Sequence, residues 1–471
     1  MDATAQLMGR LSMDVEDPPR HADGVPLGDL AGDEGSSGLG DGDGDDGGRG
    51  CTAERPPSPP PSPSGLHPSV GRTLTTHLFA EAQKQVHRLE EGVHFSTAEG
   101  MTGDSLMDLV TLLSAITFSV KAVGSMVRRL GLPGRDGPKT AREANVAAND
   151  TWIKALTASR ACSLLVSEEC EEPITVEDPG TGQYAVVFDP LTGLADPPTK
   201  DMGSIFGIFR QLTPGQAPCL SDVLQPARQL VAAGYAVYGS ATVLVLATGQ
   251  GSVDGFTLDP SLNEFVLTHP HIQVPFAGST YSINEGYCAS FDARTLLMLN
   301  TLKEEPTLAD GDPRSCRYIG SMVPEVHRTL LYGGVFIYPA HAGRPNGRLK
   351  LLYEAGPLAF VAEHAGGQAS TGSKPILDVQ PDSLHHRVPV FIGSEDDVSL
   401  CCTHFRTAPW GSGPKSDPMA ILRRTHSIDA CLRRSSSAAR SVGSFGGRSP
   451  ARGVTLDEDI DGFVCAHLPV L

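Results

Sequence analysis

The arrangement of apolar and polar residues predicts a chain built from both helices and buried strands. Apolar residues recur at three- and four-residue steps from Leu106 to Leu130, the spacing of an amphipathic helix, and a second helix is expected from Glu143. Uninterrupted apolar runs bounded by turn residues are typical of core strands. Such a run occupies Ala185–Phe188, Ser204–Phe209 is again expected to be a strand, and strands and turns are expected to continue through Tyr235–Ala247 and Gly255–Leu258. The mixture predicts an α/β fold.

Two of the predicted strands are followed directly by acidic residues. Leu164–Val166 leads through Ser167 into Glu168 and Glu169, and Ala185–Phe188 leads into Asp189, after which Pro190 and Gly193 are expected to turn the chain. Strand ends in open α/β sheets form ligand crevices, and carboxylate oxygens are the ligands that Mg²⁺ takes. Acids also follow strands simply because strands end at water. The pattern therefore leaves both a metal site and solvated strand ends open.

Composition separates two tails from the rest of the chain. The 471 residues carry a net charge of −18, and residues 1–70 hold 13 acidic residues and 4 arginines, a local charge of −9. This acidic, Gly/Asp/Pro-rich tail is expected to be disordered. Residues 407–471 form a basic Ser/Arg-rich tail, also expected to be mostly disordered. Serine beside arginine suits phosphorylation by basophilic kinases, and regulation and plain disorder both remain open for it.

Several classes of protein are disfavoured. The sequence shows no basic face of the kind that binds nucleic acid. The 10 cysteines show no C-x-x-C or paired metal spacing, so a reducing compartment fits best. The N-terminus lacks the pattern of a secretory signal. Gly234, Tyr238 and Gly239 interrupt the apolar stretch 230–247, which favours buried strands over a membrane span. These features predict a cytoplasmic protein with neither membrane nor nucleic-acid partners.

Four short motifs carry a resemblance to a known family. They are Ser167-Glu168-Glu169, Asp189-Pro190-Leu191, the N-E-G-Y sequence Asn284–Tyr287, and Arg317-Tyr318-Ile319-Gly320-Ser321-Met322-Val323 followed by His327-Arg328-Thr329. With these motifs the chain resembles the class I fructose-1,6-bisphosphatases from roughly Thr73 to Val398. Inositol-phosphate phosphatases share that fold but have neither N-E-G-Y nor the last motif.

The resemblance implies a layered sheet-and-helix sandwich of the sugar-phosphatase type, flanked by the two tails. We expect an N-terminal regulatory-type domain at residues 71–235, containing the S-E-E and D-P-L segments. A C-terminal sugar-phosphate-binding domain is expected at residues 236–406. The activity implied is hydrolysis of the 1-phosphate of a ketose bisphosphate, dependent on Mg²⁺, with Mn²⁺ as the alternative cation.

The resemblance also implies roles for individual residues. The metal ligands carried over are Glu168, Asp189, Glu354 and the Leu191 carbonyl. Glu169 is implied to help generate the nucleophile, and Lys350 to lie beside the 1-phosphate. The cradle of the 6-phosphate is implied to be Asn284, Tyr287, Tyr318 and Tyr338. Arg317 is implied to reach that phosphate from a neighbouring subunit, and Arg348 replaces a lysine that holds the sugar.

Departures from the family pattern gather at the metal end. Thr192 replaces a metal-ligating Asp, Asn145 replaces an Asp that supports water activation, Lys139 aligns with a further Asp, and Leu194-Ala195 replaces a Ser-Ser pair. An amide cannot act as a general base. These changes favour a protein with weakened or lost catalysis, acting as a sugar-phosphate sensor, as a homo-oligomer, or in a hetero-oligomer with an active paralogue. The alternative is an active Mg-dependent fructose-1,6-bisphosphatase or sedoheptulose-bisphosphatase-type phosphatase.

Overall fold

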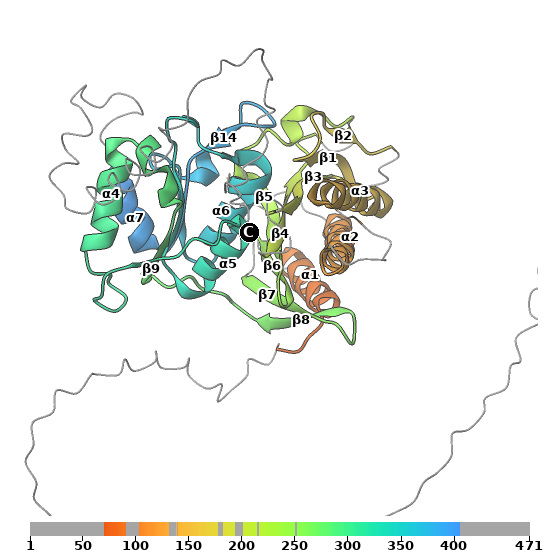
Figure 1. Ribbon diagram of the computed structural model, residues 1–471. Helices are drawn as coiled ribbons and strands as arrows, with labels where there is room; N and C mark the ends of the chain where they lie inside the picture. Colours follow the sequence, from red (N-terminus) through yellow and green to blue (C-terminus); the bar gives the residue numbers. More distant parts are fainter. Residues whose placement is uncertain are drawn as a thin grey trace, which may run out of the picture. The chain divides into compact units, whose positions relative to one another are not determined.

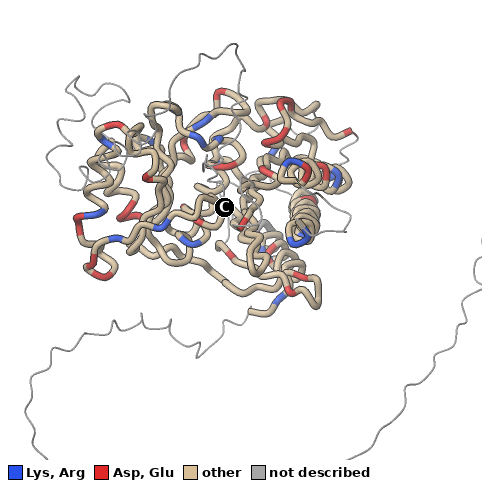
Figure 2. The backbone as a smooth tube through the Cα atoms, in the orientation of Figure 1, with Lys and Arg blue, Asp and Glu red and all other residues tan. Residues whose placement is uncertain are grey.

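The computed structural model describes most of the chain between the two tails. The described residues are 70–90, 103–130, 138, 140–177, 182–193, 201–213, 216–249 and 252–405. The expected disordered tails, 1–70 and 407–471, lie outside them apart from Val70, as do Lys139, Leu194 and Ala195. Acidic and basic residues are interspersed along the described backbone (Figure 2).

Three helices come first and form one outer layer (Figure 1). They are α1 (Leu74–Glu90), α2 (Gly103–Val127) and α3 (Ala141–Ser159). Helix α3 begins where the Thr140 side chain accepts a hydrogen bond from the Glu143 N–H, and it ends at Arg160, whose φ of 56° is left-handed. Trp152 of α3 stacks on Phe188 of the sheet with ring centroids 5.2 Å apart. That aromatic contact fixes α3 against the strand that carries Asp189.

Among the described residues, eight strands form the large sheet, in the order β2-β1-β3-β4-β5-β6-β7-β8. Their bounds are β1 (Cys162–Ser167), β2 (Ile174–Thr175), β3 (Tyr184–Thr192), β4 (Met202–Arg210), β5 (Leu230–Tyr238), β6 (Thr242–Thr248), β7 (Val253–Asp259) and β8 (Glu264–His269). Only β1 and β3 pair in parallel; the other neighbours are antiparallel. The apolar stretch 230–247 is therefore a buried hairpin of β5 and β6, as predicted.

A second sheet and its helices follow along the chain. In the described residues its strand order is β10-β9-β11-β15-β13, and β12 pairs with β14 in a separate ladder. The strands are β9 (Thr280–Ser282), β10 (Ser315–Cys316), β11 (Val335–Tyr338), β12 (Leu349–Lys350), β13 (Gln368–Ser370), β14 (Arg387–Val388) and β15 (Val390–Gly393). The helices are α4 (Ala293–Glu304), α5 (Met322–Tyr332), α6 (Gly356–His364) and α7 (Glu395–Thr403). Short helical turns lie at Leu220–Asp222, Ala227–Gln229, Glu285–Ser290, Leu351–Ala355 and Ile376–Asp378.

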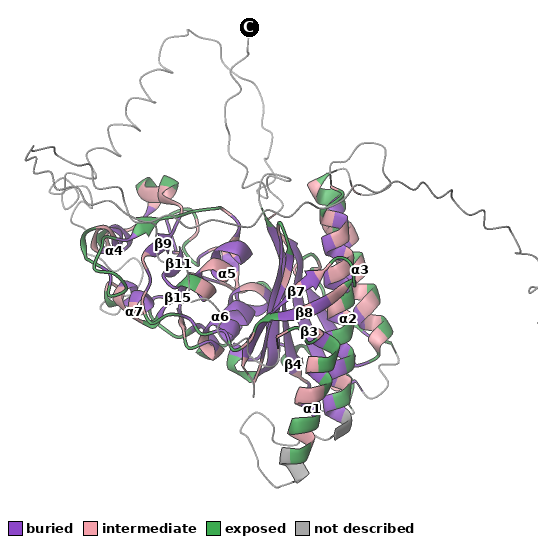
Figure 3. Cartoon of the chain, turned by 90° about the horizontal axis from the view of Figure 1, so that it is seen from below, coloured by how far each residue is buried: buried purple, intermediate pink, exposed green. Residues whose placement is uncertain are grey.

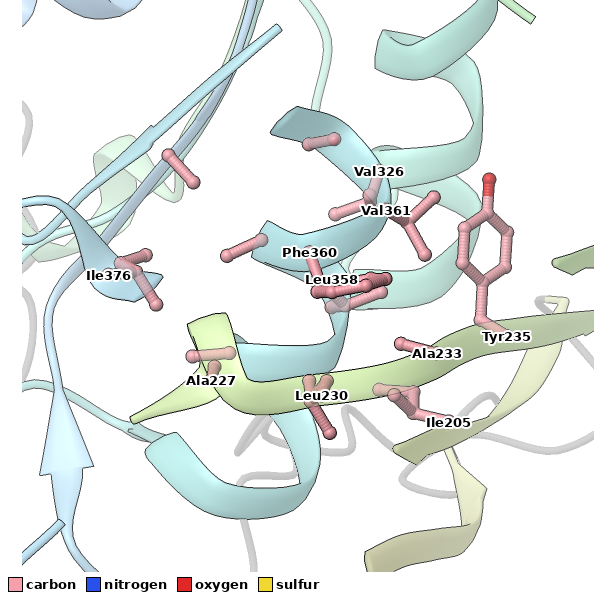
Figure 4. Close-up of a cluster of buried hydrophobic side chains, with 14 of the residues drawn as sticks. Ile205, Ala227, Leu230, Ala233, Tyr235, Val326, Leu358, Phe360, Val361 and Ile376 are labelled. Carbon is pink, nitrogen blue, oxygen red and sulfur yellow. The ribbon is translucent and has the colours of Figure 1, made fainter. Parts of the chain in front are cut away.

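These elements stack as helices, sheet, helices, sheet and helices (Figure 3). Helices α1–α3 cover one face of the large sheet, α5 and α6 lie between the two sheets, and α4 and α7 cover the outer face of the second sheet. In the central layer Leu358 and Phe360 of α6 pack against Leu230 and Ala233 of β5 (Figure 4). The Tyr235 hydroxyl lies 3.0 Å from Nδ1 of His327 on α5. The layered sandwich predicted from the sequence is confirmed.

Close packing of α5 on β4 depends on a glycine. A Cβ on Gly203 would lie 2.5 Å from the Val323 Cβ, closer than side chains approach, so only glycine fits there. This contact fixes α5, which follows directly on Arg317–Ser321, against the strand next to β3.

Three details differ from expectation or qualify it. Strand β3 does not end before Asp189 but continues to Thr192, with a register irregularity between those residues, and Gly193 (φ 90°) then turns the chain. The expected domain boundary between residues 235 and 236 falls inside β5, so the large sheet continues across it. Within α2, Ser105–Val127 is long and apolar enough to span a membrane by length and composition, but 56 % of its most apolar window is buried, as in a core helix.

Candidate functional site

The two acid-bearing strand ends lie side by side because β1 and β3 are parallel neighbours. Ser167 pairs with Phe188 in the register, and the Glu168 N–H donates to the Phe188 carbonyl at 3.0 Å. Parallel pairing brings the carboxyl ends of both strands to the same edge of the sheet. Glu168, Glu169 and Asp189 therefore lie at one edge, as the sequence suggested.

Asp189 is the most buried of these acids, with 4 % of its surface exposed. The Leu191 N–H donates to its Oδ1 at 3.2 Å, and the Thr192 hydroxyl also hydrogen-bonds to its carboxylate. Burial raises the pKa of Asp189 well above its usual value, and the nearby charges of Glu354 and Glu169 raise it further. Thr192 thus supports the Asp189 carboxylate instead of adding a second one.

Lys350 connects Glu168 and Glu354. Strand β12 pairs with β14 and presents the Lys350 ammonium to Oε1 of Glu168 in a close ion pair. The Lys350 N–H donates to Oε2 of Glu354 at 2.5 Å, across the wide turn Leu351–Ala355. Burial raises the pKa of Glu354, while this N–H and the charges of Lys350, Arg348 and Arg387 oppose the rise. The structure therefore gathers Glu168, Glu169, Asp189, Glu354 and Lys350.

Asn145 lies in the first turns of α3, on the same helical face as Asn149. Asn149 accepts a hydrogen bond from the Ser167 hydroxyl at 2.7 Å, which fixes α3 to the end of β1. The side-chain oxygen of Asn145 is buried and has no hydrogen-bond partner among the described residues. A buried, unpaired acceptor is costly, so this oxygen is suited to a ligand or a cation.

A second group of side chains forms around Tyr338 at the end of β11. Nη1 of Arg348 donates to the Tyr338 hydroxyl at 3.3 Å, and the guanidinium carbon lies 5.8 Å from that ring centroid. Burial raises the pKa of Tyr318 to about 12; neighbouring Tyr338 and Tyr287 raise it, and Arg348 and a hydrogen bond with Asn284 lower it. The five residues predicted for a phosphate cradle and sugar contact thus lie together.

Arg317 lies apart from that group. Its side chain is exposed, and its backbone N–H donates to the Tyr281 carbonyl at 2.9 Å. Burial lowers the pKa of Arg328, and the charge of Arg317 lowers it further. Within the described residues its guanidinium has no acidic partner.

Comparison with known proteins gives two adjoining family matches. Residues 88–270 match the model described as fructose-1-6-bisphosphatase, N-terminal domain, and residues 274–405 match its C-terminal domain. The chain belongs to the fructose-1,6-bisphosphatase family. The two family matches adjoin between residues 270 and 274, beyond β8.

Individual fructose-1,6-bisphosphatases are similar over most of their length. A cytosolic fructose-1,6-bisphosphatase of Brassica napus is 47 % identical over 305 residues, which is 63 % of this chain and 88 % of that protein. The fructose-1,6-bisphosphatase isozyme 2 of Mus musculus is 44 % identical over 301 residues, 62 % of this chain and 87 % of that protein. A crystal structure of the Leishmania major fructose-1,6-bisphosphatase in holo form has a TM-score of 0.61 at 38 % identity, over 71 % of this chain and 99 % of that one.

In this member of the fructose-1,6-bisphosphatase family, the side chains of the carboxylate cluster are of the type that binds a hard cation, but in the part of the chain that the structure describes they are not placed around one ion. Buried Asp189 beside two acids, and the unpaired Asn145 oxygen, are donors of the type that Mg²⁺ takes. Yet among the described residues no three Asp, Glu, His or Cys side chains are placed to ligate one ion. The Lys350 ammonium instead neutralises Glu168.

Sequence reasoning missed two residues that border this site. Nη1 of Arg387 donates to the Arg348 carbonyl, and its charge is among those that oppose the rise in the Glu354 pKa caused by burial. Nδ1 of His385 lies 2.5 Å from the Tyr353 hydroxyl, next to Glu354. The run His385-His386-Arg387 before the apolar strand at 388–393 is a signal that could have found them.

Proposed function

We propose that this protein recognises a sugar phosphate through the Tyr338 cradle and that its hydrolysis of a ketose 1-phosphate is weakened or lost. The observation that supports this best is the contrast between the two groups of side chains. Asn284, Tyr287, Tyr318, Tyr338 and Arg348 lie together, and phenol, amide and guanidinium donors suit a phosphate ester. At the metal end, Thr192 and Asn145 stand where the family has two carboxylates.

A divalent cation, Mg²⁺ or Mn²⁺, remains part of the proposal. The residues that would hold it are Glu168, Asp189 and Glu354, with the Leu191 carbonyl. When bound, such a cation polarises a phosphoryl group and activates a water. Glu169, exposed at the same edge, is the residue proposed to help generate the nucleophile. Binding is expected to be weakened because Thr192 brings no negative charge and the Lys350 ammonium already pairs with Glu168.

The second candidate is an active Mg-dependent fructose-1,6-bisphosphatase or sedoheptulose-bisphosphatase-type phosphatase. What favours it is Asp189, a buried carboxylate whose nearest charged neighbours include two more acids. That arrangement gains from a bound cation. In either case the protein is proposed to act in carbohydrate metabolism, in gluconeogenic-type chemistry, and in the cytoplasm, since relatives such as that of Brassica napus are named cytosolic.

The proposal is tested by separating binding from turnover. Calorimetry with fructose 6-phosphate in EDTA is expected to show binding that Arg348→Ala weakens at least about ten-fold, since a hydrogen bond to a charged group is worth about 1.5–3 kcal/mol. The matched control is Arg72→Ala, an exposed arginine before α1. No binding would remove the recognition proposal.

Turnover is measured as phosphate release from fructose 1,6-bisphosphate with Mg²⁺ or Mn²⁺, beside the Brassica napus relative. The protein is expected to release phosphate at least about 100-fold more slowly, since one lost general base costs a factor of about 10²–10⁴. Release at the rate of the relative would establish the second candidate instead.

A further inference from the structure

A pocket distinct from the Tyr338 cradle and the carboxylate cluster opens beside the β12–β14 ladder. Its volume is about 630 Å³, within the range of small-molecule sites. None of the residues predicted for the active site lines it. It borders that site through Arg387, which donates to the Arg348 carbonyl.

The lining of this pocket is positively charged in a chain that is strongly acidic. Arg294, Lys374 and Arg387 line it, and Asp382 is the only acid among the described residues of the lining. The Arg294 guanidinium is paired with Asp292 at 2.8 Å, so Lys374 and Arg387 carry most of the positive charge. Asp382 is already paired with His386 at 3.1 Å. Burial and the charges of Lys350 and Arg387 lower the pKa of His385, so its imidazole adds a polar group without charge at neutral pH. Concave sites of one charge concentrate ions of the opposite charge.

Lys374 is an exposed residue of the pocket lining that is carried by a closed turn. The turn that carries it is closed on both sides, since the Thr371 N–H donates to the Lys374 carbonyl at 2.8 Å and the Lys374 N–H donates to the Thr371 hydroxyl at 3.1 Å. No acidic side chain pairs with its ammonium in the described part of the chain. The closed turn thus places at the pocket a lysine whose ammonium makes no ion pair within the described residues.

Aromatic rings form an apolar wall of the same pocket. Phe391 of β15 and Phe405 lie with ring centroids 5.1 Å apart, and the Arg294 guanidinium carbon lies 5.5 Å from the Phe405 centroid. Cationic groups beside an apolar wall suit a ligand that has both a polyanionic end and an apolar part.

We infer that this pocket is a second binding site, for a small phosphorylated molecule with at least two negative charges and an apolar portion. Lys374, Arg387 and Arg294 receive the anionic end, and Phe391 and Phe405 contact the apolar portion. The inference does not depend on the proposed function, because its residues are not those of the cradle.

The test uses inorganic pyrophosphate as the anionic probe and the full chain in EDTA, with fructose 6-phosphate saturating the cradle. Calorimetry is expected to show one pyrophosphate bound per chain, and Lys374→Glu to weaken it at least about ten-fold, which is about 1.4 kcal/mol. Lys154→Glu, the same change at an exposed lysine of α3, is the matched control and is expected to bind as the unmodified protein does. Lys374→Met repeats the test without adding a negative charge.

The cradle variant Arg348→Ala separates the two sites. It is expected to keep pyrophosphate binding while losing affinity for fructose 6-phosphate. Absence of pyrophosphate binding, or equal binding by Lys374→Glu and Lys374→Met, would overturn the inference. The inference would also be overturned if Arg348→Ala lost pyrophosphate binding while Lys374→Glu kept it, since the probe would then sit in the cradle.

Discussion

Charge balance around Asp189 is decided by a few side chains. Asp189, Glu169 and Glu354 approach one another at the sheet edge, while Lys350 pairs its ammonium with Glu168 and donates its N–H to Glu354. Thr192 offers Asp189 a hydroxyl. Burial, with the charges of Glu354 and Glu169, therefore opposes ionisation of Asp189 in the folded protein.

Replacing Asp189 with Asn is expected to stabilise the protein in EDTA at neutral pH. The pKa of Asp189 is higher in the folded protein than in the unfolded chain. The contribution of Asp189 to the free energy of unfolding is therefore complete below the unfolded pKa of about 3.9 and is lost as the pH rises through the folded value. Asp189→Asn removes that loss. Thermal unfolding at pH 7–8 should therefore show a free energy of unfolding about 1–3 kcal/mol higher for the variant, the usual cost of a poorly satisfied buried group. The gain should vanish near pH 4.

Asp254→Asn is the control of opposite sign. Burial tends to raise the pKa of Asp254, but hydrogen bonds from His77, the His271 N–H and Ser252 outweigh it, and the pKa is lowered. Its contribution is present above about pH 4, the unfolded value, and is lost as the pH falls. Asp254→Asn should therefore destabilise the protein at neutral pH. If Asp189→Asn also destabilises it there, the charge imbalance does not exist.

Restoring the two family carboxylates is expected to raise turnover. Thr192→Asp adds a ligand beside Asp189, and Asn145→Asp supplies a carboxylate in the first turns of α3. Groups that act as a unit are strongly non-additive, so each change alone should do little. The double variant should release phosphate from fructose 1,6-bisphosphate with Mg²⁺ at least about ten-fold faster than the unmodified protein. An unchanged rate, with metal binding tightened by calorimetry, would contradict the view that these two residues limit catalysis.

At the scale of elements, the site depends on how α3, β1 and β3 meet. The helix is fixed by Trp152 on Phe188 and by Asn149 on Ser167, so any change that loosens its first turns acts on Asn145. The sequence predicted this helix from Glu143, and it begins at Ala141; the capping pattern of Thr140 followed by Glu143 is the signal that could have given its start.

Weakening the N-cap of α3 is expected to destabilise the fold modestly. Thr140→Ala removes the oxygen that accepts from the Glu143 N–H at 3.2 Å, which costs about 0.5–2 kcal/mol. Thr140→Ser keeps the oxygen and should retain stability to within about 0.5 kcal/mol, since N-cap Ser and Thr are of similar quality. Both values come from chemical denaturation followed by circular dichroism. Equal stability of Thr140→Ala and the unmodified protein would show that the cap contributes nothing.

Elements with a long periodic signal were predictable, and short ones were not. Helix α2 and strands β4, β5 and β6 follow from apolar spacing, because their buried faces repeat over several residues. Strand β3 was expected to end at Phe188, since Pro190 has no N–H to donate. It continues because Pro190 lies where the β3–β4 register shifts, one of the few places a sheet tolerates proline. Two-residue strands such as β12 and β14 have no period to detect, so the position of Arg387 beside Arg348 could not be derived.

At the scale of the whole molecule, the order of the layers came from the family resemblance and not from residue patterns. Parallel pairing of β1 with β3 brings acids of separate strands together, but nothing local specifies it. The cradle was likewise predicted by motif; its residues extend from Asn284 to Arg348, a separation across which sequence spacing alone says nothing of contact.

Oligomerisation is the prediction that belongs to this scale. Around Arg317, Ile319 and Tyr332 are 47 % and 69 % exposed, and the Arg328 guanidinium carbon lies 5.9 Å from the Tyr332 ring centroid. Exposed apolar residues beside two arginines of like charge suit a surface that another subunit covers. We therefore expect a dimer or tetramer of this chain, or a hetero-oligomer with an active paralogue, in which Arg317 reaches the cradle of a neighbour.

Light scattering of the purified chain at micromolar concentration should give a mass of two or four chains. Arg317→Ala should leave that mass unchanged and weaken fructose 6-phosphate binding at least about ten-fold, because a charge-assisted hydrogen bond to phosphate is worth about 1.5–3 kcal/mol. Arg72→Ala should change neither quantity. A monomeric mass would contradict the homo-oligomer and leave the paralogue complex to be sought by mixing. An oligomer whose Arg317→Ala variant binds the sugar phosphate normally would show that the arginine does not serve the neighbouring cradle.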